Sequence, residues 1–461
     1  MYMAFSNTGP LDLQTIGQAA GDTAPHSLSE YYNISFTDGT STPSAGTISI
    51  SDFLGKTIGS SGTGTWTEQA RLVSPDASST DFFGLSVSIS GNYAVVGAYR
   101  EDPVVTGGTQ TDGGAAYVYV RSGTMWYFQA RLTPTDLEHY DNFGFSVAID
   151  GDYVIVGSRY EDPGGTQSAG AAYIFVRSGT SWSQQQKLIA YDKGQDDQFG
   201  FRVAIDGLTA IVGAPRQDHT STDTGSVYVF VRSGTSWYVQ QQLTASDPGQ
   251  YDQFGFSVAI DGDNIIVGSP YEDPGNVNSA GSAYIFVRSG TSWSQQAKLS
   301  ASDKESYALF GHRVDIDGDY VVVGAYVEDP SAGFFPMTDA GSAYIFVRSG
   351  TSWSQQQKLT ASDKAYYDRF GSGVAIEGSR VVIGAVYEDD GGTNSGATYV
   401  FDRSGSTWTQ TIKLINSDAS SDDRTGIGVS LSGNYFITGS YYHTVIGANQ
   451  QRQGAAYIYI I

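Results

Sequence analysis

One unit recurs along most of this sequence, and its period limits the folds that the chain can adopt. A representative copy, residues 247–299, reads DPGQYDQFGFSVAIDGDNIIVGSPYEDPGNVNSAGSAYIFVRSGTSWSQQAKL. A Phe-Gly pair marks six copies at intervals of 55 to 60 residues, and Thr425-Gly426 continues the register in a seventh. All seven tryptophans of the chain occupy one position of the unit: Trp66, Trp126, Trp182, Trp237, Trp293, Trp353 and Trp408. A repeat of this length predicts an array of similar structural units.

Each copy contains four predicted β-strands. In the copy above they cover residues 254–260, 264–269, 282–287 and the segment after the Ser289-Gly290 turn. Asp261-Gly262 suits a tight hairpin because both residues tolerate positive φ. The two middle strands are almost continuously apolar, which is typical of strands covered on both faces, whereas the fourth carries Gln and Lys and is predicted to lie outside. The chain is therefore predicted to be all-β, a seven-bladed β-propeller of four-stranded antiparallel blades.

The two ends of the repeat region are complementary. It begins with an unpaired fourth strand at residues 65–72 and ends with an unpaired third strand at residues 455–461. We expect the N-terminal strand to pair with the last blade, because this pairing closes the ring without an open sheet edge. The predicted domains are a small irregular N-terminal module, residues 1–60, and the propeller, residues 61–461.

Composition excludes several classes of protein. The chain has no cysteine, so neither disulfides nor thiolate metal sites are expected. Its 48 acidic and 25 basic residues give a net charge of −23, which disfavours nucleic acid as a partner because phosphate contacts need Lys and Arg. No segment reaches the roughly 18 apolar residues of a membrane span, and MYMAFSNTG lacks the basic and apolar runs of a secretion signal. We expect no membrane insertion.

Residues 1–60 do not belong to the repeat. They contain three short elements, GPLDLQTI, HSLSEYY and GTISISDFLG, separated by Gly, Ser, Thr and Pro. Their apolar residues are too few for an independent core, so we expect this segment to dock onto the propeller, a copy of itself or another protein. The candidate docking residues are Leu28, Tyr31, Tyr32, Ile48, Ile50, Phe53 and Leu54.

The aspartates of the repeat are the first candidate site. Every copy has Asp seven residues before the Phe-Gly position, and six copies have Asp two residues before it. Clustered carboxylates suit Ca²⁺, which prefers six to eight oxygen ligands. The alternative is that each Asp caps a turn through backbone amides, and no cofactor is then required. The Ca²⁺ candidates are Asp76, Asp81, Asp136, Asp141, Asp192, Asp197, Asp247, Asp252, Asp363, Asp368, Asp418 and Asp423.

These aspartates and the acidic loops after the second strands are predicted to share one face of the disc. That face is expected to be strongly acidic, and the opposite face, with its Asp-Gly and Arg-Ser-Gly turns, to have mixed charge. The connections from strand four to strand one and from strand two to strand three emerge on the same side of an up-and-down blade, which is the reason for this expectation.

Departures from the repeat are where a specific function is expected. The five histidines occupy unlike positions and are interpreted as isolated surface or loop residues, and no nucleophile elbow or phosphate loop is found, so we predict that the protein is not an enzyme. The fifth copy inserts AGFFPM into a loop, and an exposed apolar tip is typical of a contact site. The partner-binding candidates are Phe334, Phe335 and Met337, with Val104 and Val105 in the corresponding loop of the first copy.

The repeats resemble the FG-GAP family, the blades of integrin-α-like propellers, and in particular its bacterial branch. LTASDPGQYDQFGFSVAIDGDNIIVGSPYEDP and GSAYIFVRSGTSW carry the resemblance, which spans residues 66–461. The calcium-binding blades of integrin-type propellers carry an Asp-x-Asp-x-Asp-Gly loop, and no copy here has one. The resemblance implies a propeller used for binding, and the missing loop leaves its calcium sites without their usual ligands.

Residues 7–56 are similar to a second group of proteins. SLSEYY and SAGTISISDFLG, with GPLDLQTI upstream, resemble small modules near the ends of virion proteins of tailed bacteriophages. This resemblance implies a structural virion protein on the particle surface, and a tail or fibre adhesin is the first expectation. Residues 1–60 would contact other virion proteins, and the propeller a host-surface protein or glycan. The alternatives are a head decoration protein, a bacterial extracellular adhesin and, last, an enzyme that acts on host polysaccharide.

Overall fold

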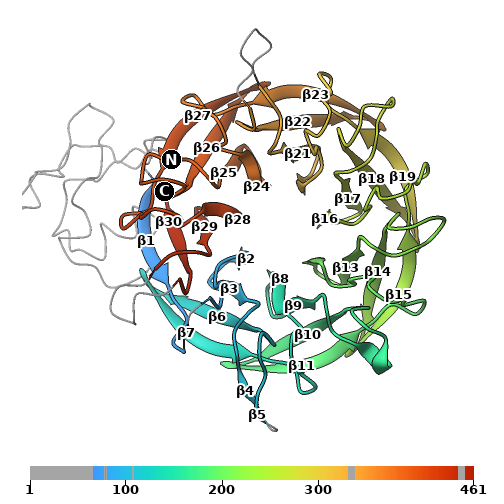
Figure 1. Cartoon of the computed structure of the whole chain (residues 1–461), viewed down its shortest axis with the longest axis vertical. Helices are drawn as coiled ribbons and strands as arrows, with labels where there is room; N and C mark the ends of the chain where they lie inside the picture. Colours follow the sequence, from blue (N-terminus) through green and yellow to red (C-terminus); the bar gives the residue numbers. More distant parts are fainter. Residues whose placement is uncertain (1–65, 77, 79, 106–107, 331–337, 445–451) are drawn as a thin grey trace, which may run out of the picture. The chain divides into compact units, whose positions relative to one another are not determined.

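The computed structural model describes residues 66–461, except 77, 79, 106–107, 331–337 and 445–451. Within this part, Thr67–Ile460 form one compact unit that contains seven four-stranded antiparallel sheets. The sheets stand around a common axis as the blades of a propeller (Figure 1). The prediction of an all-β, seven-bladed propeller is confirmed. The candidate docking residues, all between Leu28 and Leu54, lie outside the described residues.

The strands of each blade follow one another in the sheet. Blades one and two contain β2 (Val87–Ser90), β3 (Tyr93–Ala98), β6 (Ala115–Ser122) and β7 (Met125–Leu132), then β8 (Phe143–Asp150), β9 (Tyr153–Ser158), β10 (Ala171–Ser178) and β11 (Ser181–Leu188). Blades three and four contain β12 (Arg202–Asp206), β13 (Thr209–Ala214), β14 (Ser226–Ser233) and β15 (Ser236–Leu243), then β16 (Ser257–Asp261), β17 (Asn264–Ser269), β18 (Ser282–Ser289) and β19 (Ser292–Leu299).

Blades five to seven continue the series. Blades five and six contain β20 (Arg313–Asp317), β21 (Tyr320–Ala325), β22 (Ser342–Ser349) and β23 (Ser352–Leu359), then β24 (Phe370–Glu377), β25 (Arg380–Ala385), β26 (Ala397–Ser404) and β27 (Thr407–Leu414). Blade seven contains β28 (Thr425–Ser432), β29 (Tyr435–Ser440), β30 (Ala455–Ile460) and β1 (Thr67–Leu72). Two loops add a small hairpin, β4 (Val104–Val105) with β5 (Gly108–Thr109), and a 3₁₀ turn, η3 (Pro163–Gly165).

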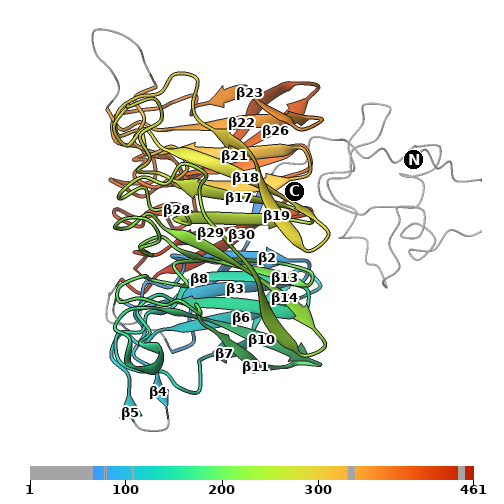
Figure 2. The same cartoon turned by 90° about the vertical axis from the view of Figure 1, so that its right-hand side faces the viewer.

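The first strand of each blade lies nearest the axis and the fourth lies at the rim (Figure 1). The loop face carries the connections from strand four to strand one and from strand two to strand three, including the β4–β5 hairpin at the lower left of Figure 2. The hairpin face carries the tight turns. The middle strands are buried as their apolar sequences predict: Val95, Ile155 and Ile211 are fully covered. In the described part of the chain, no helix is long and apolar enough to cross a membrane.

Strand β1 completes the last blade. It pairs antiparallel with β30, and Arg71 on β1 forms an ion pair with Asp418 of blade seven. At the rim, Trp126 Nε1 of blade one donates a hydrogen bond to Gln69 Oε1 on β1 at 2.8 Å, as the corresponding tryptophans do to glutamines of preceding blades elsewhere. The predicted closure of the ring by the N-terminal strand is confirmed.

The Phe-Gly pair joins each blade to the one before it. The backbone N–H of Phe143 donates to the carbonyl of Gly113 in the preceding blade at 2.8 Å, and the bond recurs around the ring. Gly144 has a φ of 91°, and a Cβ there would lie 2.2 Å from the carbonyl oxygen of Ala115. A Cβ on Gly97 would lie 2.0 Å from the carbonyl oxygen of Gly144. The Phe-Gly and Gly-Ala pairs therefore recur together because two backbones touch where they meet.

Side chains of the first strands join neighbouring blades at the axis. The first strand is a sheet edge, so some of its N–H groups have no partner within the sheet. Ser146 Oγ accepts the N–H of Val203 in the next blade at 3.1 Å. One layer of such bonds, at the hairpin face, links all successive blades; its acceptors are Ser90, Asp150, Asp206, Asp261, Asp317, Glu377 and Ser432.

Candidate functional site

The aspartate seven residues before the Phe-Gly position lies in a polar cluster on the loop face. In blade four, Tyr284 Oη and Lys298 Nζ donate to the two carboxylate oxygens of Asp247 at 3.0 and 2.6 Å. Lys298 Nζ also lies 2.8 Å from Glu272, whose other oxygen accepts a 2.6 Å hydrogen bond from Ser282. A tyrosine donates in the same way to Asp76, Asp192, Asp303, Asp363 and Asp418. Asp136 binds Lys187 at 2.7 Å.

In blade three uncharged residues replace the Lys–Glu pair of this cluster. Gln242 stands where blades two, four, five and six have Lys and blade one has Arg131, and Gln217 stands where these five blades have Glu. Gln242 Nε2 donates to Asp192 at 3.1 Å and to Ser226 at 3.1 Å, and Ser226 donates to Gln217 at 2.9 Å. Both charges of the pair are replaced together, so the Lys and Glu side chains form one structural unit.

In blade seven the cluster contains residues from both ends of the repeat region. Arg71 takes the place of Lys, and His443 takes the place of Glu. His443 is buried, with Nδ1 2.9 Å from Asp423 and Nε2 3.6 Å from Asp418. His443 and His312 lie outside the strands, as the interpretation of the histidines as isolated surface or loop residues requires, but neither is isolated: His312 packs on Tyr326 with ring centroids 4.2 Å apart.

The aspartate two residues before the Phe-Gly position caps its own turn. Asp252 is buried and accepts the N–H of Gly249 at 2.6 Å. Burial raises the pKa of Asp252 to about 6, with the charges of Glu272 and Asp273 adding to the effect, although the Gly249 N–H opposes it. The same cap recurs at Asp81, Asp141, Asp197, Asp368 and Asp423.

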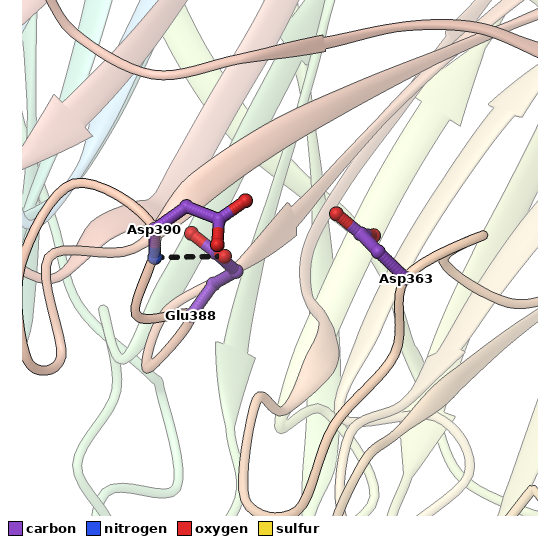
Figure 3. A group of neighbouring side chains, drawn as sticks. All are labelled: Asp363, Glu388 and Asp390. Atoms are coloured by element: carbon purple, nitrogen blue, oxygen red, sulfur yellow. Dashed lines mark hydrogen bonds between the residues drawn. The ribbon is translucent and has the colours of Figure 1, made fainter.

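The acidic group with the closest metal-like spacing is Asp363, Glu388 and Asp390 in blade six (Figure 3). One oxygen from each lies within 4.8 Å of the others. Lys413 Nζ lies 2.5 to 2.7 Å from all three carboxylates, so an ammonium already stands among them. Burial lowers the pKa of Lys413, but its hydrogen bonds to Asp363, Asp390 and Glu388 outweigh burial and the net shift is upward. A metal ion here would have to displace the lysine.

The Ca²⁺ candidates therefore have intramolecular hydrogen bonds in both sets, and binding of Ca²⁺ stays a prediction. Calorimetric titration of the propeller with Ca²⁺ tests it, and no heat at millimolar concentration would exclude it in practice. Of the partner-binding candidates, Val104 on β4 is 69% exposed, and Val105 is partly buried against the apolar cluster that blades one and two share. Phe334, Phe335 and Met337 lie outside the described residues.

Aromatic and cationic side chains form a closed circuit around the axis at the loop face, which we call the axial ring. Its first part consists of ring pairs 4.2 to 5.6 Å apart: Phe82–Tyr99, Tyr99–Phe145, Phe145–Phe201, Phe201–Phe256, Phe256–His312 and His312–Tyr326. Arg369 then bridges Tyr326 and Tyr387, Arg424 bridges Tyr387 and Tyr442, and Tyr442 returns to Phe82 at 4.9 Å. Because all seven blades contribute, the axial ring encloses the mouth of the central channel.

Further arginines stand on the axial ring, Arg159 and Arg202 among them. Arg159 lies 3.7 Å from the centroid of Phe145, and Arg202 lies 5.2 and 5.0 Å from the centroids of Phe145 and Phe201. Arg202 and Arg313 begin the inner strands β12 and β20 and line a cavity of about 260 Å³ on the axis. The expectation that this face is strongly acidic is therefore wrong at its centre, where Arg159, Arg202 and Arg313 lie.

The arginines of this mouth repel one another. Burial, followed by the charges of Arg313 and Arg159, holds the pKa of Arg202 well below its usual range. Burial lowers the pKa of Arg313 to about 10. Burial and then the neighbouring arginines, Arg313 first, also lower the pKa of His312, so its imidazole is neutral at pH 7. Positive charge is thus concentrated where the surroundings disfavour it.

The opposite mouth of the channel is acidic. Five carboxylates of the hairpin-face layer, from Asp150 to Glu377, line a cavity of about 340 Å³ there. One layer above, Asp315 accepts the N–H of Ile376 at 2.8 Å, and burial raises its pKa to about 7. The channel therefore has arginine at the loop face and carboxylate at the hairpin face, an asymmetry that composition alone does not indicate.

The sequence did contain a signal for these arginines. Three residues after the Phe-Gly phenylalanine, or its Thr425 equivalent, the seven copies have Ser86, Ser146, Arg202, Ser257, Arg313, Gly373 and Gly428. Arginine at two of seven otherwise small positions is a break in the repeat, and it lies in the inner strands rather than in the loops where contact residues were predicted. The axial ring itself required the fold, since its members come from several repeat positions.

The family of the chain follows from the same repeats. The FG-GAP repeat model matches residues 66–119, 126–175, 182–230, 237–286, 293–346, 353–401 and 408–459, one match to each predicted copy. The chain belongs to the FG-GAP repeat family. The matches cover most of the chain, and in this FG-GAP protein the Phe-Gly and Gly-Ala pairs of the family pattern form the contact between blades described above. No curated protein matches the sequence.

Solved structures show similarity at the level of the fold. One chain of a mitotic checkpoint complex is 11% identical, with a TM-score of 0.50 over 86% of this chain and 94% of that chain. Sqt1 of Saccharomyces cerevisiae is 10% identical, with a TM-score of 0.44 over 79% of this chain and 81% of that chain. At these identities the similarity concerns the fold, and it carries no functional inference.

Proposed function

We propose that this FG-GAP protein is a non-enzymatic structural protein of a tailed-bacteriophage particle that binds a partner through the loop face of its propeller. The observation that carries the binding role is the mouth inside the axial ring. There the blades cease to be alike, and arginines without carboxylate partners among the described residues face the channel. Rigid scaffolds with variable loops suit a display function.

The phage assignment is supported by residues 7–56, with their SLSEYY and SAGTISISDFLG motifs. In this proposal residues 1–60 attach the protein to other virion proteins, and the propeller faces a host-surface protein or glycan. A tail or fibre adhesin is the favoured role. Repetition of the Asp, Tyr, Lys and Glu clusters in most blades favours a structural function for them over catalysis, because catalysis needs unlike groups at one place.

Imaging of purified particles that carry a label at residue 461 tests the location. Label at the tail or its fibres supports the adhesin, and label over the head indicates a decoration protein instead. Absence of the chain from purified particles would contradict the phage assignment and favour the bacterial extracellular adhesin.

Adsorption measurements test the binding role of the loop face. Replacing Phe334 and Phe335 together by Ser is expected to weaken adsorption or assembly without changing thermal unfolding. Replacing Tyr127 and Tyr238, exposed aromatic residues on β7 and β15, by Ser serves as the control. Equal adsorption of both variants and the parent would remove the fifth-blade loop from the proposed contact surface.

A further inference from the structure

The inner strands have one position at which arginine replaces a structural residue. Where this position holds serine, the hydroxyl binds the next blade: Ser86, Ser146 and Ser257 accept the N–H groups of Val147, Val203 and Val314 at 2.9 to 3.1 Å. Arginine has five N–H donors and no acceptor, so Arg202 and Arg313 cannot make this bond. Their presence removes a contact between blades, and a role other than packing is needed to explain them.

Most donors of these two guanidinium groups are unused. Among the described residues, Arg202 Nη1 donates to its neighbour's carbonyl, that of Phe201, at 2.9 Å, and Arg313 Nη1 donates to that of His312 at 3.0 Å. Neither group forms an ion pair with any described residue, although the lysines of the polar clusters on the same face do. Unpaired guanidinium groups in a confined site are costly, and an anion would relieve that cost.

Aromatic packing fixes part of this site. Phe145 and Phe201 lie under Arg202, and the His312 ring packs between Phe256 and Tyr326. Side chains fixed by packing lose little freedom when a ligand binds. The cavity that both arginines line, about 260 Å³, admits the charged end of a small ligand. Asp315 lies at its wall with its carboxylate bonded to the N–H of Ile376, and the remaining border consists of small or aliphatic residues of the inner strands.

We infer that the loop-face mouth of the channel is a binding site for an oxyanion at the end of a ligand, a carboxylate or phosphate group held by Arg202 and Arg313. Planar guanidinium groups match the oxygens of both groups in bidentate fashion. Arg159 stands on the same axial ring and adds positive charge at the entrance. The inference names a ligand chemistry for the proposed binding function, and it rests on that proposal only for its biological role.

The test is calorimetric titration of the full chain, at low ionic strength, with four probes: glucuronate, glucose 6-phosphate, inorganic phosphate and glucose. We expect heat with at least one anionic probe and none with glucose. Binding of glucuronate alone identifies a sugar carboxylate, and binding of glucose 6-phosphate with or without inorganic phosphate identifies a phosphate group. Failure of all three anions at millimolar concentration, or equal binding of glucose, overturns the inference.

Variants make the test specific to the site. Arg202→Ser and Arg313→Ser restore the residue that three other blades use at this position, so the fold is expected to be retained or strengthened. Each is expected to weaken binding roughly tenfold or more, the effect of one charged hydrogen-bonding partner. The double variant Arg288→Ser with Arg348→Ser removes the same charge from the hairpin face and is expected to bind as the parent does. Unchanged affinity of R202S/R313S overturns the inference.

The outcome can be separated from that of the proposed function. If the anion binds but purified particles do not contain the chain, the phage role fails and the site stands. If labelled particles and adsorption behave as proposed but no anionic probe binds, the site fails alone. Adsorption of particles that carry R202S/R313S then shows whether the mouth contributes to attachment.

Discussion

The Lys and Glu of each polar cluster are predicted to be energetically coupled, and blade three provides the design for a test in blade four. We consider Lys298→Gln, Glu272→Gln and the double variant, which recreates the Gln242 and Gln217 arrangement. In the parent, Lys298 Nζ lies 2.8 Å from Glu272, whose side chain is 10% exposed.

The expected loss of stability for each variant depends on which charged group the substitution leaves without a partner. Lys298→Gln leaves the buried Glu272 carboxylate with Ser282 alone, and we expect a loss of roughly 2–3 kcal/mol, below the full value for a buried pair because the lysine side chain is partly exposed. Glu272→Gln leaves Lys298 paired with Asp247 and is expected to cost about 1 kcal/mol. The double variant is expected to cost about 1 kcal/mol, so the coupling free energy is roughly 2 kcal/mol.

Urea unfolding of the four proteins measures this coupling, followed by tryptophan fluorescence and by far-UV circular dichroism. Agreement of the two signals and an unchanged m-value are needed before midpoints are converted to free energies. Lys304→Gln is the control, because this lysine is exposed and its one hydrogen bond within the described part of the chain is to Ser300; the change in stability is expected to be less than about 0.5 kcal/mol. A double variant destabilised by the sum of the two single variants would refute the reasoning.

Three further predictions concern the ring as a whole. Deleting residues 61–73 removes β1 and exposes the edge of β30, so a lower melting temperature and concentration-dependent aggregation are expected in calorimetry and light scattering; unchanged melting would contradict closure. Gly144→Ala places a Cβ 2.2 Å from a carbonyl oxygen and is expected to lower the free energy of unfolding by roughly 3 kcal/mol or more. Gly151→Ala is the control: its Cβ meets no atom within 4 Å, and a loss of about 1 kcal/mol is expected. Equal urea midpoints for the two variants would be inconsistent with the contact. Burial raises the pKa of Asp197, Asp252 and Asp368 to about 6, from a value of 3.8 in the unfolded state. At a pH between these two values the native state binds more protons than the unfolded state, so the stability of the fold is expected to fall as pH rises from about 4 to 7. Melting temperatures across that range check the sign, and Asp252→Asn should flatten the profile.

The fold could be predicted because the same pattern of strand and turn residues recurs seven times. Asp-Gly turns, apolar middle strands and polar rim strands are each visible in one copy, and repetition removes the ambiguity of any single copy. The closure was also predictable, since each end of the repeat region lacked what the other had. The first residue of a strand was less predictable. β16 begins at Ser257 rather than at the predicted Phe254, whereas β8 and β24 begin at the phenylalanines of their Phe-Gly pairs.

The site was predictable only in part. The positions of the aspartates were visible, but their partners come from other segments, as when Tyr284 and Lys298 bind Asp247. The acidic face was inferred from the number of carboxylates, and that count cannot show that lysines pair with them or that Arg202 and Arg313 meet at the axis. The local electrostatic potential depends on which side chains are neighbours in space, and composition does not contain this information.

The ring is closed where β1 pairs with β30, and the place of this pairing affects how the gene can be arranged. The two chain ends of the ring lie on adjacent strands of blade seven, β1 and β30, where the other blades have a Ser-Gly turn. A turn of that kind between Ile460 and Thr67 would make all seven sheets continuous, and the ring could then be opened at any equivalent turn. Circular permutation is thus compatible with this architecture, and no blade is obliged to be made first.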